Sequence, residues 1–331
     1  VERPAGRAPT RWFTYERRPK MAKTALYGDY RQNGKVAICD AMESTGNRYY
    51  VHSTDGTDNT AHGDTPSAPF ASIDYAVGQC TASQGDIIIV MPGHTEDCDA
   101  AADIDFDVAG IKVIGVGWGD NRPKITFSET DATVECNADD MWIENIRFMG
   151  NVADLVVGVD VKTGCDDLVF KNCEFGGTTA AKEMLIAVTI EATNDRITFD
   201  GCYFKEPTGG DATAAIYTEG AFTNLLIKDC LFWGDWSTAT LDLDAAAVTG
   251  DGLLVMDTDA YNSDTGAGLF CTLADTTVAH FVRCTTGVGK PGTPPVPAAD
   301  DGATTAIECY GTEAASTYGV IWPLTATNFG D

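Results

Sequence analysis

The middle of the chain repeats one pattern of apolar and polar residues about every 28 residues. In each eight-residue copy, apolar residues fill the first, third, sixth and eighth positions. Alternation of this kind is typical of β-strands, and the shift by one position in the middle separates two short strands. The four clearest copies align without gaps at residues 141–148, 168–175, 197–204 and 225–232. Weaker copies lie at residues 111–118, 253–260 and 279–286, and another begins at Ile87.

The fifth residue of each copy favours a sharp bend between the two strands. These residues are Gly115, Asn145, Asn172, Gly201, Asp229 and Asp257. Gly, Asn and Asp tolerate a left-handed backbone best, so we predict a left-handed corner at each of these positions. Such a corner keeps the apolar residues of both strands on the inner side.

The rest of each period has room for a third strand. We place it at residues 132–138, 155–161, 184–192, 214–219 and 268–273. Three short strands per period predict a coil whose successive turns stack into parallel sheets. Stacking would bury two columns of side chains, Phe148, Phe175, Phe204 and Phe232 in one and Ile146, Cys173, Cys202 and Cys230 in the other. The strand period excludes an α-helical repeat, and a β-propeller is disfavoured because it needs hairpin turns and a longer period.

The corner residues and the opening segment, residues 50–94, resemble the right-handed parallel β-helices of the pectate-lyase-like superfamily. The corner column looks like the asparagine ladder of that family. The opening segment is similar to that of phage-encoded virion β-helix proteins. We therefore predict an all-β fold, a right-handed parallel β-helix solenoid with an N-terminal capping helix and extended N- and C-terminal segments.

The expected organisation has three parts. Residues 1–49 form a basic N-terminal arm and lead-in, and residues 50–286 form the parallel β-helix. The capping helix lies near residues 70–82, where apolar residues recur at helical spacing after Pro69. Residues 287–331 hold a Pro-rich linker and a C-terminal segment for capping or oligomerisation.

The net charge is divided sharply along the chain. The 49 Asp and Glu against 22 Lys and Arg give a formal net charge of -27. Residues 1–36 hold nine bases and three acids, a net charge of +6, while the other 295 residues hold 13 bases and 46 acids, a net charge of -33. An acidic body argues against nucleic acid as a partner, and no apolar run is long enough to span a membrane.

The basic arm has two interpretations. It is either a solvated tail or leader upstream of a start at Met21, or a docking arm that binds an acidic partner surface. In the second case the docking residues are Arg7, Arg11, Trp12, Phe13, Arg17, Arg18 and Lys20.

The sequence has few residues that indicate disulfide bonding, metal binding or catalysis. We expect the cysteines to be free and to pack as small hydrophobes, with pairing of Cys80 with Cys98, or of Cys271 with Cys309, left open. Calcium is the natural cofactor to consider for the acidic segments at residues 103–107 and 242–244, but a solvated acidic face is favoured, so we expect no cofactor. Neither a carboxylate pair nor a lyase-type basic site is evident, so no catalytic residue is assigned.

The leading hypothesis is a non-enzymatic structural protein of a virion, a phage capsid decoration (cement) or spike protein assembled in the host cytoplasm. Its expected partners are a major capsid or other virion protein and further copies of itself, and the resemblance implies a trimer. Two alternatives stay open. One is a polysaccharide lyase, glycosidase or tailspike depolymerase of the β-helix class, and the other is a glycan-binding β-helix module.

Overall fold

A computed structural model describes residues 44, 46–210, 212–243, 250–266, 269–273, 277–288, 304–312 and 320–321, together with two short strands nearer the N-terminus. The chain divides into two units, Val1–Glu43 and Ser44–Asp331. In the first unit, β1 (Arg31–Gln32) and β2 (Lys35–Val36) pair antiparallel. The docking-arm residues of the sequence analysis lie outside the described residues.

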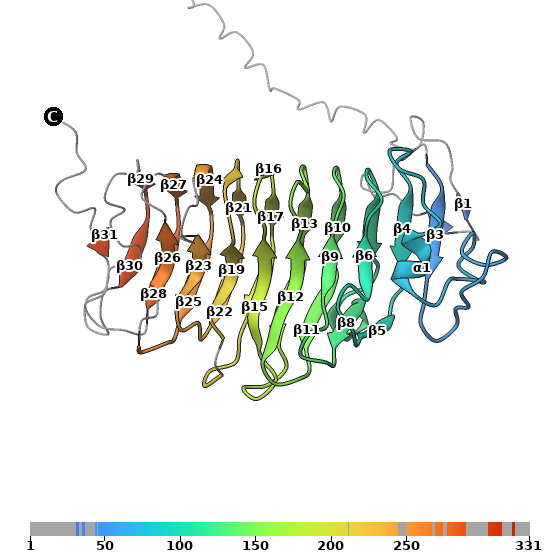
Figure 1. Cartoon of the computed structure of the whole chain (residues 1–331), viewed down its shortest axis with the longest axis horizontal. Coiled ribbons are helices and arrows are strands. Elements are labelled where there is room, and N and C mark those ends of the chain that lie inside the picture. The colour runs from blue at the N-terminus through green and yellow to red at the C-terminus, as the bar shows by residue number, and fades with distance from the viewer. Residues whose placement is uncertain are drawn as a thin grey trace, which may run out of the picture. The chain divides into compact units, whose positions relative to one another are not determined.

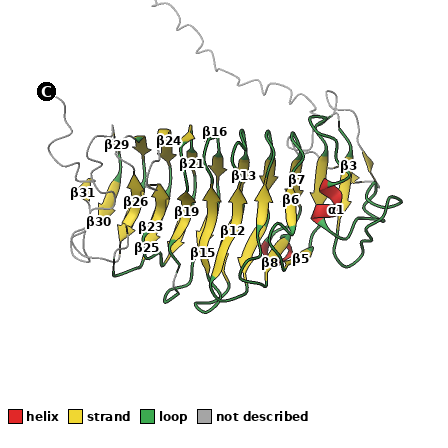
Figure 2. Cartoon of the chain, in the orientation of Figure 1, coloured by secondary structure: helices red, strands yellow, loops and turns green. Residues whose placement is uncertain are grey.

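The second unit is a stack of coils, and each coil in its middle adds a strand to each of three sheets (Figure 1). Nearly all of its regular structure is β-strand (Figure 2). Sheet I holds the strands before the predicted corner: β3 (Arg48–Val51), β4 (Ile87–Val90), β7 (Lys112–Gly115), β10 (Trp142–Glu144), β13 (Val169–Lys171), β17 (Thr198–Asp200), β21 (Leu226–Lys228), β24 (Gly250–Met256), β27 (Val278–Val282) and β29 (Thr304–Ile307), with the short β16 (Asn194–Asp195) and β20 (Phe222–Thr223).

Sheet II holds the strands after the corner: β5 (Thr95–Cys98), β8 (Lys124–Phe127), β11 (Arg147–Gly150), β14 (Glu174–Gly177), β18 (Tyr203–Lys205), β22 (Leu231–Gly234), β25 (Asp259–Asn262), β28 (Thr285–Val288), β30 (Tyr310–Thr312) and β31 (Val320–Ile321). Sheet III holds the third strands: β6 (Ile104–Phe106), β9 (Val134–Cys136), β12 (Leu155–Val161), β15 (Met184–Ile190), β19 (Ala214–Thr218), β23 (Ala239–Leu243) and β26 (Leu269–Leu273). Neighbouring strands within each sheet are parallel, except that β31 pairs antiparallel with β30. The predicted all-β parallel solenoid is therefore confirmed.

The corner between sheets I and II is a single left-handed residue in most turns. The φ angles are 61° at Asn145, 51° at Asn172, 66° at Gly201, 53° at Asp229 and 51° at Asp257. Arg283 and Glu308 continue this column with φ of 53° and 54°, although neither residue type is prone to that conformation.

The prediction of a left-handed corner at Gly115 is wrong. Gly115 ends β7, and a longer loop with the 3-10 helix η3 (Gly119–Asn121) connects it to β8. Within this loop Gly117 has a φ of 129°, and Trp118, which the repeat placed inward, is 84% exposed. Asn145 supports the loop from the next turn, because its Nδ2 donates to the carbonyl oxygens of Gly115 (2.8 Å) and Gly117 (3.1 Å).

The two predicted inward columns lie in the core. Phe148, Phe175, Phe204 and Phe232 are fully buried, and their rings stack with centroid distances of 5.0, 4.7 and 4.6 Å along the column. Ile146, Cys173, Cys202 and Cys230 are at most 3% exposed. The thiols also donate hydrogen bonds to backbone carbonyls near the corner, as from Cys202 to Phe170 O at 3.4 Å. A cysteine there fills a small apolar site and adds a weak hydrogen bond to a backbone carbonyl.

A second left-handed column was missed by the sequence analysis. It lies in the bend that leads into sheet I and includes Asp140, Asp167, Arg196 and Asn224, with φ between 54° and 59°. Each turn therefore has two sharp bends, and only the one with a regular residue signature was predicted.

The two ends of the described stack differ. Helix α1 (Ile73–Val77) falls within the predicted range but is shorter, and it packs Ile73, Ala76 and Val77 into the core beside β6. At the other end, β29 and β30 add strands to sheets I and II beyond residue 286, in register with β27 and β28. No helix among the described residues is long and apolar enough to cross a membrane.

Candidate functional site

A row of carboxylates runs along the outer face of sheet III. Asp105, Glu135 and Asp160 are register partners on β6, β9 and β12. Their inner-face neighbours, such as Ile104 and Phe106, are buried, so the acidic side chains point outward. We call these three residues the carboxylate row. Neighbouring strands are about 4.8 Å apart, so the carboxylates stand within one strand spacing of each other.

Lys162 lies beside this row between two acidic groups. Its Nζ is 3.0 Å from Asp160 Oδ2 and 2.5 Å from Glu191 Oε1. Hydrogen bonds to Glu191 and Asp160 raise the pKa of Lys162 above its usual value. The ammonium therefore stays charged at neutral pH and is unsuited to act as the base of an elimination reaction.

Asp160 and Asp105, two members of the carboxylate row, have raised pKa values, whereas a salt bridge ordinarily lowers the pKa of a carboxyl group. Burial raises the pKa of Asp160, against the opposing hydrogen bond from Lys162, and Asp160 Oδ1 has no hydrogen-bond partner in the part of the chain that the structure describes. Burial also raises the pKa of Asp105, whose Oδ1 accepts a hydrogen bond from Asn137 Nδ2 at 2.7 Å. A carboxyl group with a raised pKa can serve as a proton donor, which is the chemistry a glycosidase needs from one of its two acids.

The sequence analysis missed this row because it searched for paired acids only on the strands around the corner. The alternation of acids with buried residues at residues 103–107 is the signal that could have found it. Across the described residues, no group of three or more His, Cys, Asp or Glu side chains is arranged to hold a metal ion. Calcium binding therefore gains no support from side-chain geometry there.

Aromatic side chains gather on a different face. Trp233 and Tyr261 are register partners on β22 and β25, and their ring centroids are 4.8 Å apart. Trp233 is 54% exposed, Tyr261 38% and the neighbouring Leu231 42%. We call Leu231, Trp233 and Tyr261 the aromatic platform. It lies on sheet II, so the platform and the carboxylate row are on separate sheets.

Charged side chains on the outer faces of sheets I and II neutralise each other in pairs. Glu174 accepts hydrogen bonds from Arg147 Nε at 3.0 Å and from Arg122 Nη1 at 3.2 Å. Lys228 Nζ is 3.0 Å from Asp200 Oδ2 on the neighbouring strand. Such pairs, formed between successive turns, are what cross-strand compensation produces in a stacked sheet.

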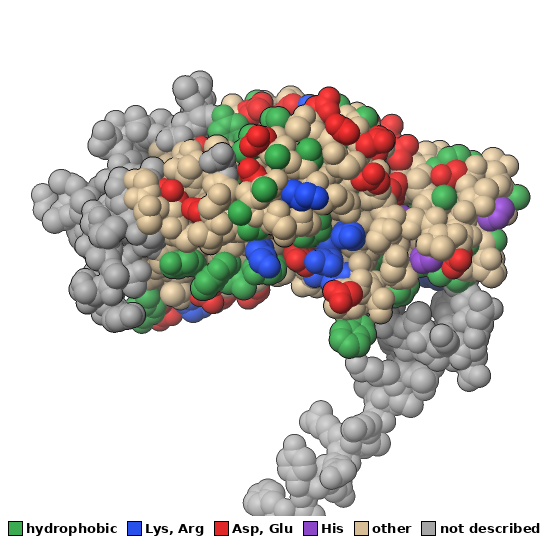
Figure 3. All heavy atoms as spheres, turned by 90° about the horizontal axis from the view of Figure 1, so that it is seen from below, with side chains coloured by type: hydrophobic (Ala, Val, Ile, Leu, Met, Phe, Trp, Pro, Cys, Tyr) green, Lys and Arg blue, Asp and Glu red, His purple; other side chains and the backbone are tan. Residues whose placement is uncertain are grey.

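Some aspartate side chains also accept hydrogen bonds from the backbone of a neighbouring turn. At the bend before sheet I, Asp139 Oδ1 accepts a hydrogen bond from Asp166 N at 3.0 Å, and Asp166 Oδ1 accepts one from Asp195 N at 2.8 Å. Each aspartate thus satisfies an amide of the next turn. Figure 3 shows acidic side chains gathered along one edge of that view, with basic side chains near its middle.

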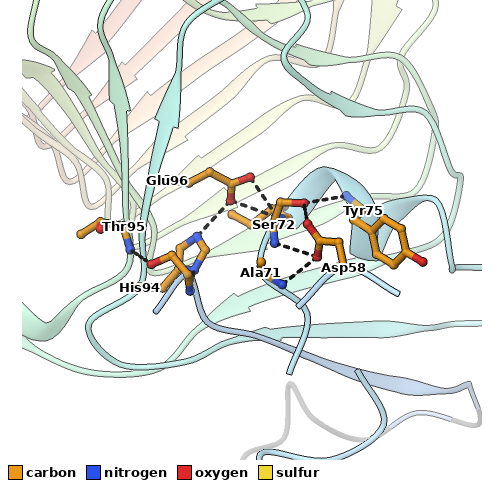
Figure 4. A network of polar contacts seen from close by, with 9 residues as sticks. Asp58, Ala71, Ser72, Tyr75, His94, Thr95 and Glu96 are labelled. Atoms are coloured by element: carbon orange, nitrogen blue, oxygen red, sulfur yellow. Dashed lines mark hydrogen bonds and ion pairs between the residues drawn. The ribbon is translucent and has the colours of Figure 1, made fainter. Parts of the chain in front are cut away.

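A polar network at the N-terminal end of the stack has residue types that are common in active sites (Figure 4). His94 is fully buried, and its Nδ1 accepts a hydrogen bond from Ser53 N at 3.0 Å. Nε2 therefore carries the proton, and it donates to Glu96 Oε2 at 2.9 Å. Glu96 in turn accepts from the backbone of Ile73, at the first residue of α1, at 3.0 Å.

The other half of this network caps the same helix. Asp58 accepts hydrogen bonds from Ala71 N at 2.7 Å and from Ser72 Oγ at 2.9 Å, and Ser72 Oγ accepts one from Tyr75 N at 3.3 Å. Both ring nitrogens of His94 are occupied, and the acids are directed at backbone amides. We conclude that this network positions α1 rather than a substrate.

One more acidic side chain is buried in the core. Glu206 is 3% exposed, follows β18, and accepts a hydrogen bond from Gly177 N at 3.1 Å. Burial raises the pKa of Glu206 to about 8. Glycines on both sides make room for it, since a Cβ at position 177 would lie 2.5 Å from Glu206 Oε1 and one at position 234 would lie 2.8 Å from Glu206 Cβ.

Comparison with known proteins supports the fold and little more. No protein-family model and no curated protein matches the chain. Among solved structures, the pectate lyase Pel9A has a TM-score of 0.57 at 13% identity, over 80% of this chain and 69% of that chain. A rhamnogalacturonan lyase (TM-score 0.47, 13% identity, 74% and 75% coverage) and ORF18 of Geobacillus virus E2 (0.46, 15%, 72% and 57%) are more distant. At this identity the likeness to the pectate lyase concerns the fold alone, and the expected resemblance to pectate-lyase-like parallel β-helices is confirmed at that level.

Proposed function

We propose that the protein is a non-enzymatic structural component of a virus particle, a capsid decoration (cement) or spike protein. It attaches to the major capsid protein or another virion protein through its basic N-terminal arm. The observation that carries this proposal is the division of charge between residues 1–36, with a net charge of +6, and the remaining chain, with -33. Opposite charge on a partner would steer the arm to its site and orient the acidic solenoid away from it.

The described solenoid has features that suit a structural component without catalytic activity. Its core is filled by continuous columns of stacked phenylalanines and thiols. Several outer-face charges form ion pairs, and Lys162, the lysine beside the carboxylate row, stays protonated. A solenoid of this kind needs only a docking segment to serve as a decoration or spike protein.

Binding to particles of the source virus tests the proposal. Full-length protein would be compared by co-sedimentation with a variant lacking residues 1–36 and with a full-length variant in which Arg7, Arg11, Arg17 and Arg18 are changed to Gln. We expect both variants to lose binding, and wild-type binding to weaken as salt rises. Lys228→Gln, which changes a body charge, is the matched control. Unchanged binding of the truncated protein would overturn the proposal.

The same proposal includes self-association, with a trimer as the expected state. Sedimentation equilibrium of the purified full-length chain measures this directly. A mass three times that of the 35.2 kDa chain supports it, and a strictly monomeric mass over the concentrations used on the particle argues against it.

A second candidate function, glycan binding, is favoured by the aromatic platform. Two exposed rings side by side on a flat sheet offer the apolar faces on which sugar rings stack, and exposed Lys205 and Asp259 flank them with polar groups. A glycan array with wild-type protein, Trp233→Ala and Trp118→Ala tests it. Binding that is lost in Trp233→Ala and kept in Trp118→Ala supports the candidate, because Trp118 is even more exposed but stands on a separate loop.

An enzyme of the polysaccharide lyase or glycosidase class is the remaining alternative, with Asp160 as its proton donor. Incubation with acidic and neutral polysaccharides, with product release followed by reducing-end and unsaturated-product assays, separates it from the structural proposal. We expect no product. Release that disappears in Asp160→Asn would instead identify the carboxylate row as an active site.

A further inference from the structure

Cys284 and Cys309 continue the inward column of Cys173, Cys202 and Cys230. They occupy equivalent places in successive turns. Cys284 follows the left-handed Arg283, and Cys309 follows the left-handed Glu308. Two backbone hydrogen bonds fix their register, from Arg283 N to Ile307 O at 2.8 Å and from Tyr310 N to Cys284 O at 2.9 Å. Both side chains point into the core, where they are at most 1% exposed.

This register suits a covalent bond between the two residues. Neighbouring parallel strands are about 4.8 Å apart, and disulfide-bonded residues have Cα separations of roughly 4.4 to 6.8 Å. The two thiols are close enough to influence each other's pKa. All ten described cysteines are free, including Cys80, Cys98 and Cys271, for which the sequence left other pairings open.

The two thiols differ in reactivity. Interaction with the Cys284 thiol, together with backbone hydrogen bonds, lowers the pKa of Cys309. The same interaction and burial raise the pKa of Cys284. Of the two thiols, Cys309 is therefore the one that more readily forms the thiolate, the form that attacks a disulfide.

We propose that Cys284 and Cys309 are a modification site, at which a low-molecular-weight disulfide such as oxidised glutathione forms a bond that joins the β29–β30 turn to the turn before it. The Cys309 thiolate attacks one sulfur of oxidised glutathione and displaces one glutathione thiolate, which gives a mixed disulfide. Cys284 then loses its proton to solvent and attacks the Cys309 sulfur, displacing the second glutathione. Two protein thiols become one disulfide, and one oxidised glutathione becomes two reduced molecules.

The interior of the column is less suited to this reaction. Cys202 has a thiol neighbour on either side, in Cys173 and Cys230, and burial raises the pKa of Cys202 well above its usual value. Cys309 belongs to the last turn of sheets I and II in which a corner is described, where local opening needs fewer contacts to break. A reagent should therefore reach Cys309 before Cys202. The inference concerns the solenoid itself and does not depend on how the arm binds.

The experiment uses the full-length protein, fully reduced and then incubated with oxidised glutathione at pH 7.5. Peptide mass spectrometry without reduction should find the Cys284 and Cys309 peptides joined, with the loss of two hydrogen atoms. Cleavage by a protease within residues 304–312 should slow by about tenfold on oxidation, because the disulfide holds the turn closed.

Two variants and one control make the result decisive. Cys309→Thr and Cys309→Ser should each abolish the cross-link and the protection. The threonine variant should fold, because Thr258 fills the equivalent place one turn before Cys284 and its hydroxyl donates to Met256 O at 2.9 Å. Cys202→Ser should leave the cross-link unchanged. If oxidised wild-type protein carries both thiols free, or glutathione on Cys309 with no cross-link, the proposal is wrong.

Discussion

The ammonium of Lys162 and the carboxylate of Asp160 form an ion pair, with a Nζ–Oδ2 distance of 3.0 Å, on the outer face of sheet III. Asp160 stands in a row of acids and has a raised pKa, which are features of a proton donor. The lysine beside it is held protonated by Glu191 and by Asp160 itself. The pair therefore offsets the charge of a crowded acidic surface and supplies no free base at this point of sheet III.

Replacing Lys162 with Met should destabilise the solenoid by about 1–3 kcal/mol, because two partly buried carboxylates lose their common partner. Urea unfolding at pH 7 measures this change. Lys228→Met is the control, since Lys228 pairs with Asp200 alone at similar exposure and should contribute less than about 1 kcal/mol. Equal losses in the two variants would show that Lys162 has no special role.

The buried Glu206 should make stability depend on pH. Its pKa is raised to about 8 in the folded chain, so the folded state retains this proton after the unfolded state has lost it. The contribution is complete at pH values below the unfolded pKa of about 4.5, and it declines by about 1.4 kcal/mol per pH unit until the pH passes about 8.

Glu206→Gln should remove this dependence, since a neutral amide is not ionised at any of these pH values. The free energy of unfolding, measured from pH 5 to pH 9, should fall less steeply for Glu206→Gln than for wild type. The exposed Glu219 provides the control, because Glu219→Gln should keep the wild-type slope. A wild-type slope in Glu206→Gln would mean that other groups set the pH dependence.

Two substitutions at Asn145 separate its backbone role from its side-chain role. Glycine keeps the left-handed conformation and loses the two hydrogen bonds to the 115–117 loop, so Asn145→Gly should cost about 1 kcal/mol. Alanine loses both features, and Asn145→Ala should cost about 1–2 kcal/mol more. Thermal unfolding of the two variants beside wild type gives the order, and equal melting temperatures for the glycine and alanine variants would show that the left-handed corner imposes no strain.

The phenylalanine column should be a main determinant of stability. Phe204 is fully buried between Phe175 and Phe232, with centroid distances of 4.7 and 4.6 Å, so Phe204→Ala should cost about 3–5 kcal/mol. Tyr261→Ala on the outer face should cost less than about 1 kcal/mol. Chemical unfolding that gives similar values for both would contradict the account of the core.

The sequence predicted the elements that repeat with a constant residue signature. Alternation located the strands on both sides of the corner, and the column of Phe148 and its successors followed from their spacing. Within the described residues, the third strands at 155–161 and 214–219 were also placed to within one residue. These features depend on local pattern and on stacking, which a sequence repeat expresses directly.

Other features depend on neighbours that a residue's own identity does not reveal. Arg196 and Arg283 adopt left-handed conformations while hydrogen bonds to adjacent turns hold them, from Arg283 N to Ile307 O and from Arg196 N to Thr223 O. A longer loop follows Gly115 in place of the predicted one-residue corner. The prediction therefore placed Trp118 on the inner side, whereas this side chain is exposed. The carboxylate row needed the register of three separate strands, which alternation within one strand does not give.

The measurement that tests the central claim most directly is a cryo-electron microscopy reconstruction of the particle of the source virus. We predict solenoids on its surface, with residues 1–36 ordered against an acidic region of a capsid or other virion protein and the acidic body facing solvent. A well-resolved particle that lacks the solenoid, or carries it through a contact that does not involve residues 1–36, would contradict the account.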